Sequence, residues 1–169
     1  MRYASLLYND VVNSDGVALT IYCQGCPHHC KGCFSQSTWD FEGGLEFTEQ
    51  EIKNCMYVLA NNPYDNIVLL GGEPFCNIDL CNAILNINNM MGKPKKVWCY
   101  TGYLFEDLLR DEKKRKLLDK IDVLIDGPFI EKLKNPKLKY RGSSNQRIID
   151  VRASLIKKQI IVLDKYMNS

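Results

Sequence analysis

The sequence predicts an α/β domain built around a mostly parallel sheet that stays open. Short apolar runs typical of buried strands alternate with segments of helical periodicity, and successive strands are separated by more than twenty residues. Separations of that length leave room for right-handed crossovers between parallel strands, whereas a hairpin needs only a short turn. In addition, glycines, cysteines and carboxylates in unusual contexts follow directly after the predicted strands.

The first half of the chain is expected to contain two strands and two helices after an N-terminal edge strand or ordered arm. Residues 17–22 alternate in side-chain character, as a strand does. A capping box at Thr48 and Glu51 opens a helix. Residues 67–70 are a continuous apolar run that suits a strand buried on both faces, and the helix after it ends at Gly92.

The second half repeats this pattern and then loses it. Residues 97–100 and 122–125 are predicted strands with a helical region between them. The charged run 111–116 is expected to be a solvated helix face or a connection, and not a binding site. Residues 147–151 suit a last short strand, and the segment from Arg152 suits a helix.

The composition describes an ordinary globular domain without the charge signature of a nucleic-acid-binding protein. Apolar residues make up 46% and charged residues 25% of the 169 positions, and the formal net charge is +2. We expect a single domain over residues 1–169. No run approaches the length of a membrane span, and the N-terminus lacks the layout of a signal peptide. We therefore expect no nucleic-acid partner, no membrane insertion and a cytoplasmic location.

Three cysteines with the spacing C-x3-C-x2-C form the most informative motif: Cys26, Cys30 and Cys33. Three thiolates can bind three irons of a [4Fe–4S] cluster and leave the fourth iron open to a substrate, much as a catalytic zinc keeps a free position. The alternative is a structural zinc site that adds Cys23 as the fourth ligand. The C-x3-C spacing is unusual between paired zinc ligands, which favours the cluster.

The remaining thiols and the two histidines receive less specific interpretations. Cys55 and Cys99 lie among apolar residues and are expected to pack in the core, since free cysteine behaves as a small buried hydrophobe. The role of Cys76, which ends a glycine-rich loop, stays open. His28 and His29 are expected on the loop surface, because the cysteine spacing already supplies enough metal ligands.

The distinctive loops should meet at one edge of the sheet. The sequences GGEPF, YTGY and DGPF each follow a predicted strand, as the cysteines do, and the carboxyl ends of strands are where α/β sheets bind ligands. Gly71 and Gly72 would let a ligand approach the backbone, because no Cβ blocks it. A closed eight-stranded barrel takes about 250 residues, so we expect a curved sheet that a large partner completes.

The segment 131–141 carries five basic residues and one acidic residue. It suits a solvated loop and a docking surface for an acidic partner equally well, and both interpretations stay open.

Several stretches together resemble a known family. CPHHCKGC followed by GGEPF resembles the radical S-adenosylmethionine (SAM) superfamily. The stretches FSQSTWDF (34–41), IDVLIDGPF (121–129) and YRGSSNQRIIDV (140–151) narrow the likeness to the small activating proteins of anaerobic (class III) ribonucleoside-triphosphate reductase. The resemblance spans most of the chain and implies an incomplete, open radical-SAM-type (β/α) barrel.

The resemblance also implies roles for individual residues. Cys26, Cys30 and Cys33 match the cluster ligands. The implied SAM contacts are Gly71, Gly72 and Glu73 for the methionine amino group, Gly32, Cys33 and Phe34 beside the adenine, and Thr101 and Asp126 on the next two loops. Two features depart from the superfamily: Gly32 stands where many members have an aromatic residue, and Cys23 is an extra thiol that we expect simply to end a strand.

The implied activity is reductive cleavage of SAM to a 5′-deoxyadenosyl radical, which generates a glycyl radical on the large subunit of the reductase. The cofactors would be a [4Fe–4S] cluster and SAM, and no catalytic acid–base pair is required. An electron donor such as reduced flavodoxin is a further implied partner. The alternatives are another radical SAM enzyme or glycyl-radical activase, and a zinc-stabilised binding module.

Overall fold

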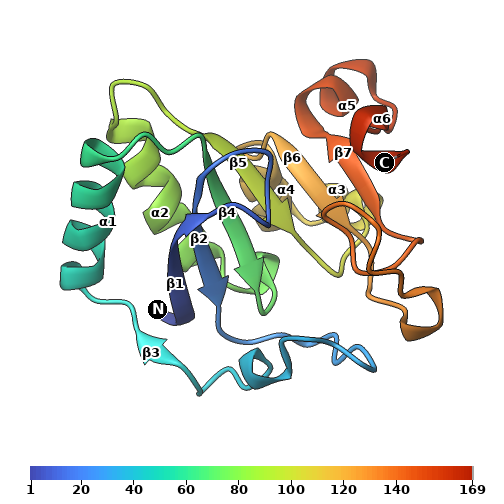
Figure 1. Ribbon diagram of the computed structural model, residues 1–169, viewed down its shortest axis with the longest axis horizontal. Helices are drawn as coiled ribbons and strands as arrows, with labels where there is room; N and C mark the ends of the chain where they lie inside the picture. The colour runs from blue at the N-terminus through green and yellow to red at the C-terminus, as the bar shows by residue number, and fades with distance from the viewer. Residues whose placement is uncertain (169) are drawn as a thin grey trace.

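The computed structural model describes residues 1–168, and the seven strands in this part form one open sheet in the order β3-β1-β2-β4-β5-β6-β7 (Figure 1). The strands are β1 Arg2–Asp10, β2 Ala18–Cys23, β3 Leu45–Glu46, β4 Asn66–Gly71, β5 Lys96–Tyr100, β6 Val123–Asp126 and β7 Arg147–Asp150. The four central strands β2, β4, β5 and β6 run parallel, and antiparallel pairs flank them on both sides. The predicted α/β class with a mostly parallel sheet is therefore confirmed.

The helices lie in the segments where they were expected, and two of these segments, 105–118 and 151–167, are each divided into two helices. They are α1 Glu49–Asn61, α2 Ile78–Met90, α3 Phe105–Arg110, α4 Glu112–Leu118, α5 Val151–Lys157 and α6 Asp164–Met167, and short 3₁₀ turns cover η1 Gln36–Thr38, η2 Pro74–Cys76 and η3 Glu131–Leu133. The capping box at Thr48 and Glu51 is present at the start of α1. Between α3 and α4, the Asp111 side chain accepts from the N–H of Lys114 and begins a new helix.

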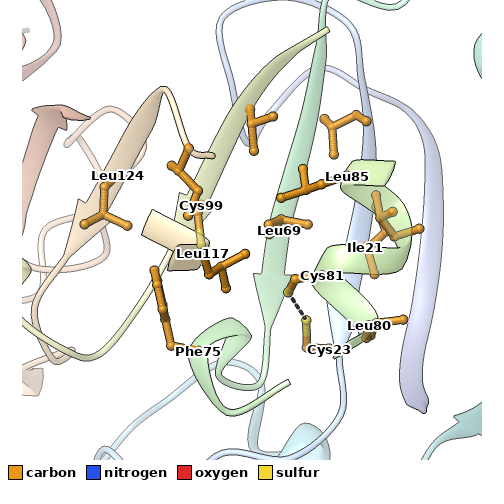
Figure 2. Packing of buried hydrophobic residues seen from close by; sticks show 14 of the residues in the cluster. Ile21, Cys23, Leu69, Phe75, Leu80, Cys81, Leu85, Cys99, Leu117 and Leu124 are labelled. Carbon is orange, nitrogen blue, oxygen red and sulfur yellow. Dashed lines mark hydrogen bonds between the residues drawn. The ribbon is translucent and has the colours of Figure 1, made fainter. Parts of the chain in front are cut away.

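The core divides into two clusters on the two faces of the sheet. One cluster packs helices α1, α2 and α4 against the sheet, and Figure 2 shows Leu80, Cys81 and Leu117 meeting the strand residues Ile21 and Leu69. The other cluster covers the opposite face, where its members are Ala18, Val68, Trp98, Val123, Ile125, Ile148 and Tyr166. Ile67, Val68 and Leu69 are fully buried and divide between the two clusters. This explains why β4 has a continuous apolar sequence.

The parallel strands bring their following loops to one edge of the sheet. Cys23 at the end of β2 pairs in register with Gly71 at the end of β4. The arrowheads of β2 and β4 point to the same edge in Figure 1, where the loop after β2 runs outward. Residues that are distant in sequence therefore share this edge. Among residues 1–168, no helix combines the length and apolar character needed to cross a membrane.

Candidate functional site

A cavity of about 330 Å³ opens at this edge and is lined by loops that follow four parallel strands. Cys26, Cys30 and Cys33 contribute from the loop after β2, which we call the cysteine loop (residues 24–35). The other lining residues include Gly71, Gly72 and Glu73 after β4, Tyr100, Thr101 and Gly102 at and after β5, and Gly127 and Phe129 after β6. The expectation that the strand-end loops meet at one edge is thus confirmed.

The three cysteines are the candidate ligands of an iron–sulfur cluster, although no group of three or more His, Cys, Asp or Glu side chains among residues 1–168 is already arranged to hold a metal ion. All three thiols are partly exposed and line the same cavity. Sγ of Cys33 accepts a hydrogen bond from the N–H of Ser35 at 3.3 Å, the kind of contact that tunes cluster potential. Burial raises the pKa of the Cys26 thiol to about 11, although the N–H groups of His28 and His29 act in the opposite direction. The thiol therefore keeps its proton at neutral pH, and a metal ion bound there would have to displace it.

Cys23 lies apart from these three thiols. It ends β2, is fully buried in the helix-covered core cluster, and its Sγ lies 4.0 Å from Sγ of Cys81 on α2 (Figure 2). Its position as the residue that ends a strand is as predicted. A zinc site of four cysteines would require Cys23 to face the cavity, and its core packing argues against that alternative.

Gly71 and Gly72 serve a purpose that the sequence did not reveal. Gly71 has φ of +96°, and a Cβ at Gly72 would lie 2.4 Å from the carbonyl oxygen of Gly25. The N–H groups of Gly72 and Glu73 also donate to the carbonyl oxygens of Cys23 and Gly25, at 2.9 and 2.8 Å. The glycines thus allow the cysteine loop to lie directly against the loop after β4.

Glu73 is the buried polar centre of the cavity, with 1% of its surface exposed. Oε1 accepts from the N–H of Phe75 at 3.0 Å and from Oγ1 of Thr101 at 2.8 Å. Oε2 accepts from the N–H of Gly102 at 2.9 Å and lies 2.6 Å from Nε2 of His28. A carboxylate oxygen only accepts, so the imidazole N–H is the donor.

The expectation that His28 lies on the loop surface is wrong. Its side chain is 19% exposed and is held between Glu73 and the ring of Tyr103, whose centroid lies 4.6 Å away in an edge-on arrangement. His28 and Glu73 are 45 residues apart, and no local pattern in the sequence indicates their contact. His29 instead stacks on Trp39, with ring centroids 4.5 Å apart.

The residues predicted beside the adenine lie where the cysteine loop meets the loop after β6. Gly32 has φ of +77°, and a Cβ there would lie 2.8 Å from the carboxylate of Glu131. Phe34 lines the cavity, yet 77% of its surface is exposed. Its ring lies beneath the ammonium group of Lys134, 4.7 Å from the ring centroid.

Asp126 lies next to the cavity lining but is not one of the residues that line it. The carboxylate is fully buried, accepts from Nε and Nη2 of Arg147 at 3.0 and 2.5 Å, and accepts from the N–H of Phe105 at 2.8 Å. Hydrogen bonds to Asp126, and then to Glu106, raise the pKa of Arg147 above its usual value. The next residue along the chain, Gly127, contributes to the cavity lining.

Several lining residues were not assigned a role from the sequence, although Tyr100 belongs to the YTGY stretch and Gln146 to the RGSSNQ stretch. These lining residues are Asn13, Tyr22, Tyr100 and Gln146. The Tyr100 hydroxyl donates to the carbonyl oxygen of Asn13 at 2.9 Å. The Gln146 amide accepts from the N–H of Gly142 and donates to the carbonyl oxygen of Gly127, which joins the RGSSNQ stretch to the loop after β6. The only sequence signal for Gln146 was the resemblance of that stretch to a family.

Comparisons with known proteins agree with this geometry. Residues 12–149 match the family model described as a 4Fe-4S single cluster domain. The chain is 35% identical to the anaerobic ribonucleoside-triphosphate reductase-activating protein of Haemophilus influenzae, over 88% of this chain and 97% of that protein. It is 34% identical to the Vibrio cholerae protein of the same name, over 88% and 97%, and 31% identical to the Escherichia coli K12 protein, over 90% and 100%. The chain therefore belongs to the family of anaerobic ribonucleoside-triphosphate reductase-activating proteins.

Proposed function

We propose that this protein is a radical SAM activase that generates a glycyl radical on an anaerobic ribonucleotide reductase. The observation that carries the proposal is the shared cavity of three thiols and one buried carboxylate, supplied by separate loops. Its relatives are named as activating proteins of that reductase.

Each group in the cavity receives a role in this proposal. Cys26, Cys30 and Cys33 would hold the [4Fe–4S] cluster, and Glu73 would accept the amino group of SAM beside Gly71 and Gly72. Gly32, Cys33 and Phe34 would border the adenine. Thr101 and Asp126 would act indirectly. Thr101 donates a hydrogen bond to Glu73, and Asp126, which precedes Gly127 in the chain, binds Arg147.

When bound, the cluster would supply one electron to the SAM sulfonium, giving methionine and a 5′-deoxyadenosyl radical, which would take a hydrogen atom from a glycine of the reductase and leave 5′-deoxyadenosine. The chain itself binds, orients and shields the reactants. Tyr22, Leu70 and Tyr100, which are half-buried, form part of the wall of the cavity. A donor such as reduced flavodoxin would supply the electron, and we place the reaction in the cytoplasm.

The open sheet supports the proposal of an incomplete (β/α) barrel. The sheet ends at β3 on one side and β7 on the other (Figure 1). The reductase would then cover the mouth of the cavity, because the radical must reach its target glycine directly.

We propose that the reductase docks on the basic loop, which we define as Lys132, Lys134, Lys137 and Lys139. All four lysines are exposed, and within residues 1–168 none of them forms an ion pair. Segment 131–141 has a net formal charge of +4, so the rest of the chain is net negative. Lys134 contacts Phe34 at the edge of the cavity. The docking interpretation of this segment is therefore preferred over that of a solvated loop.

The test uses anaerobically reconstituted protein mixed with SAM, a reductant and the candidate reductase. We expect about four irons per chain and a glycyl radical signal in electron paramagnetic resonance that requires all components. SAM cleavage without a glycyl radical would indicate another radical SAM enzyme. A colourless protein with stoichiometric zinc would indicate a zinc-stabilised binding module.

A further inference from the structure

We propose that His28 is a positioning residue that joins the cysteine loop to the carboxylate of Glu73 and sets how that carboxylate faces the cluster site. The proposal deepens the proposed function and rests on it, since it takes Glu73 as the acceptor for the amino group of SAM. Its basis is the contact of 2.6 Å between Nε2 of His28 and Oε2 of Glu73.

Glu73 collects hydrogen bonds from three segments. Phe75 donates from the same loop, Thr101 and Gly102 donate from the loop after β5, and His28 donates from the cysteine loop. A carboxylate offers about four acceptor sites, so these four donors occupy them and hold the carboxylate in one orientation, and the amino group of SAM would share an oxygen with one of them. His28 is the one side chain between Cys26 and Cys30 that takes part.

The other hydrogen bonds that the loop after β4 makes to this part of the chain involve the end of β2 and the start of the cysteine loop. The N–H groups of Gly72 and Glu73 donate to Cys23 and Gly25, and the Asn77 amide donates to Gly25 at 3.2 Å. These bonds fix where the cysteine loop begins. His28 fixes its middle, at the position where the loop passes from Cys26 to Cys30.

The surroundings of His28 hold the imidazole in place. The ring meets Tyr103 edge-on, and a Cβ at Gly102 would lie 2.5 Å from Cδ2 of His28. A glycine at 102 therefore leaves the space that the imidazole occupies. The His28 side chain is 19% exposed and lines the cavity, so it stands beside the ligand that Glu73 would bind.

The test compares His28→Ala and His28→Gln in anaerobically reconstituted protein, with SAM affinity measured by equilibrium dialysis. We expect His28→Ala to bind SAM about 10- to 100-fold more weakly, because this range corresponds to the free energy of one hydrogen bond to a charged group. His28→Gln keeps an N–H donor and should recover part of that loss. Iron content should stay at the wild-type value in both variants, because the three cluster thiols are unchanged.

A second ligand shows whether the effect passes through Glu73. The desamino analogue of SAM lacks the group that Glu73 would accept, so His28→Ala should weaken the binding of this analogue far less than that of SAM. His29→Asn serves as the matched control, because it removes the neighbouring imidazole at φ of +47°, a conformation that asparagine tolerates. This control should bind SAM as the wild type does.

The outcomes separate this inference from the proposed function. If the wild-type protein holds a cluster but binds no SAM, the proposed function fails. If the wild type binds SAM and His28→Ala binds it equally or more tightly, or loses equal affinity for both ligands, His28 does not position Glu73 and the inference is overturned.

Discussion

The ammonium group of Lys134 lies over the ring of Phe34, 4.7 Å from its centroid, and joins the basic loop to the cysteine loop. A second contact supports this junction, because the Lys31 ammonium lies 3.6 Å from the carboxylate of Glu131. The basic loop therefore borders the mouth of the cavity, which the target glycine of the reductase would have to reach.

Reversing charge on the basic loop should weaken docking of the reductase and leave the chemistry in the cavity intact. For Lys132→Glu/Lys137→Glu we expect about a tenfold loss of affinity for the reductase and a smaller dependence of affinity on salt, because surface charges steer association. Anaerobic biolayer interferometry at two ionic strengths measures this. SAM cleavage without the reductase should remain at the wild-type rate.

The matched control for this charge reversal is Lys53→Glu/Lys93→Glu. It changes the net charge equally, but at exposed positions on α1 and on the connection before β5. The docking assignment fails if the control weakens binding as much as the basic-loop variant does, or if neither variant changes it.

The cysteine assignments predict a sharp division among single substitutions. Cys26→Ala, Cys30→Ala and Cys33→Ala should each lose SAM cleavage and most of the bound iron. Cys23→Ala should keep both and lose only about 1 kcal/mol of stability, because the Cys23 side chain packs in the core beside Cys81 (Figure 2). Iron analysis and thermal unfolding distinguish the two groups, and loss of the cluster in Cys23→Ala would refute the ligand set.

The close approach of the two loops predicts that Gly72→Ala is destabilising. The added Cβ would lie 2.4 Å from the carbonyl oxygen of Gly25, so the cysteine loop must shift at a cost of about 1–3 kcal/mol. Gly92→Ala is the control, since apart from residue 92 and its two chain neighbours no heavy atom of the described residues lies within 4 Å of the new Cβ. Urea unfolding should show Gly92→Ala within about 0.5 kcal/mol of the wild type, and equal effects of the two substitutions would contradict the packing described.

The surroundings of Asp10 predict that its carboxyl group stabilises the fold in a pH-dependent way. Burial raises the pKa of its carboxyl group, but hydrogen bonds from Thr20, Asn13 and Val12 outweigh this, and the pKa lies below its usual value. A lowered pKa stabilises the fold above the unfolded-state pKa of about 4, and this contribution is lost as the pH falls through the folded-state pKa.

Urea unfolding of the wild type and of Asp10→Asn between about pH 7 and pH 3 tests this contribution. The stability advantage of the wild type should be constant at the upper end and shrink below about pH 4. An advantage that grows as the pH falls would show that Asp10 titrates in the opposite sense.

The parts of the fold with local periodicity were predictable from the sequence. The continuous apolar run 67–70 indicated a strand buried on both faces, and β4 has that burial. The capping box at Thr48 located the start of α1, because the hydrogen-bond partners of such a box lie within one helical turn. The cysteine spacing and the strand-end positions of the loops indicated which loops would meet.

The contacts that organise the candidate site were not predictable, because they join distant segments. His28 meets Glu73 across 45 residues, and Gly32 meets Glu131 across an even longer interval. The resemblance implied that Asp126 contacts SAM, and the structure shows that the Asp126 carboxylate is bound by Arg147 from the antiparallel strand β7. Neither periodicity nor spacing encodes such pairings, which follow only once the sheet order is known.

The measurement that tests the central claim most directly is Mössbauer spectroscopy of the ⁵⁷Fe-reconstituted protein before and after addition of SAM. With Cys26, Cys30 and Cys33 as the three protein ligands, one iron of four should be distinct, and its isomer shift should change when SAM binds. Four irons with full thiolate ligation and spectra that SAM leaves unchanged would contradict the account.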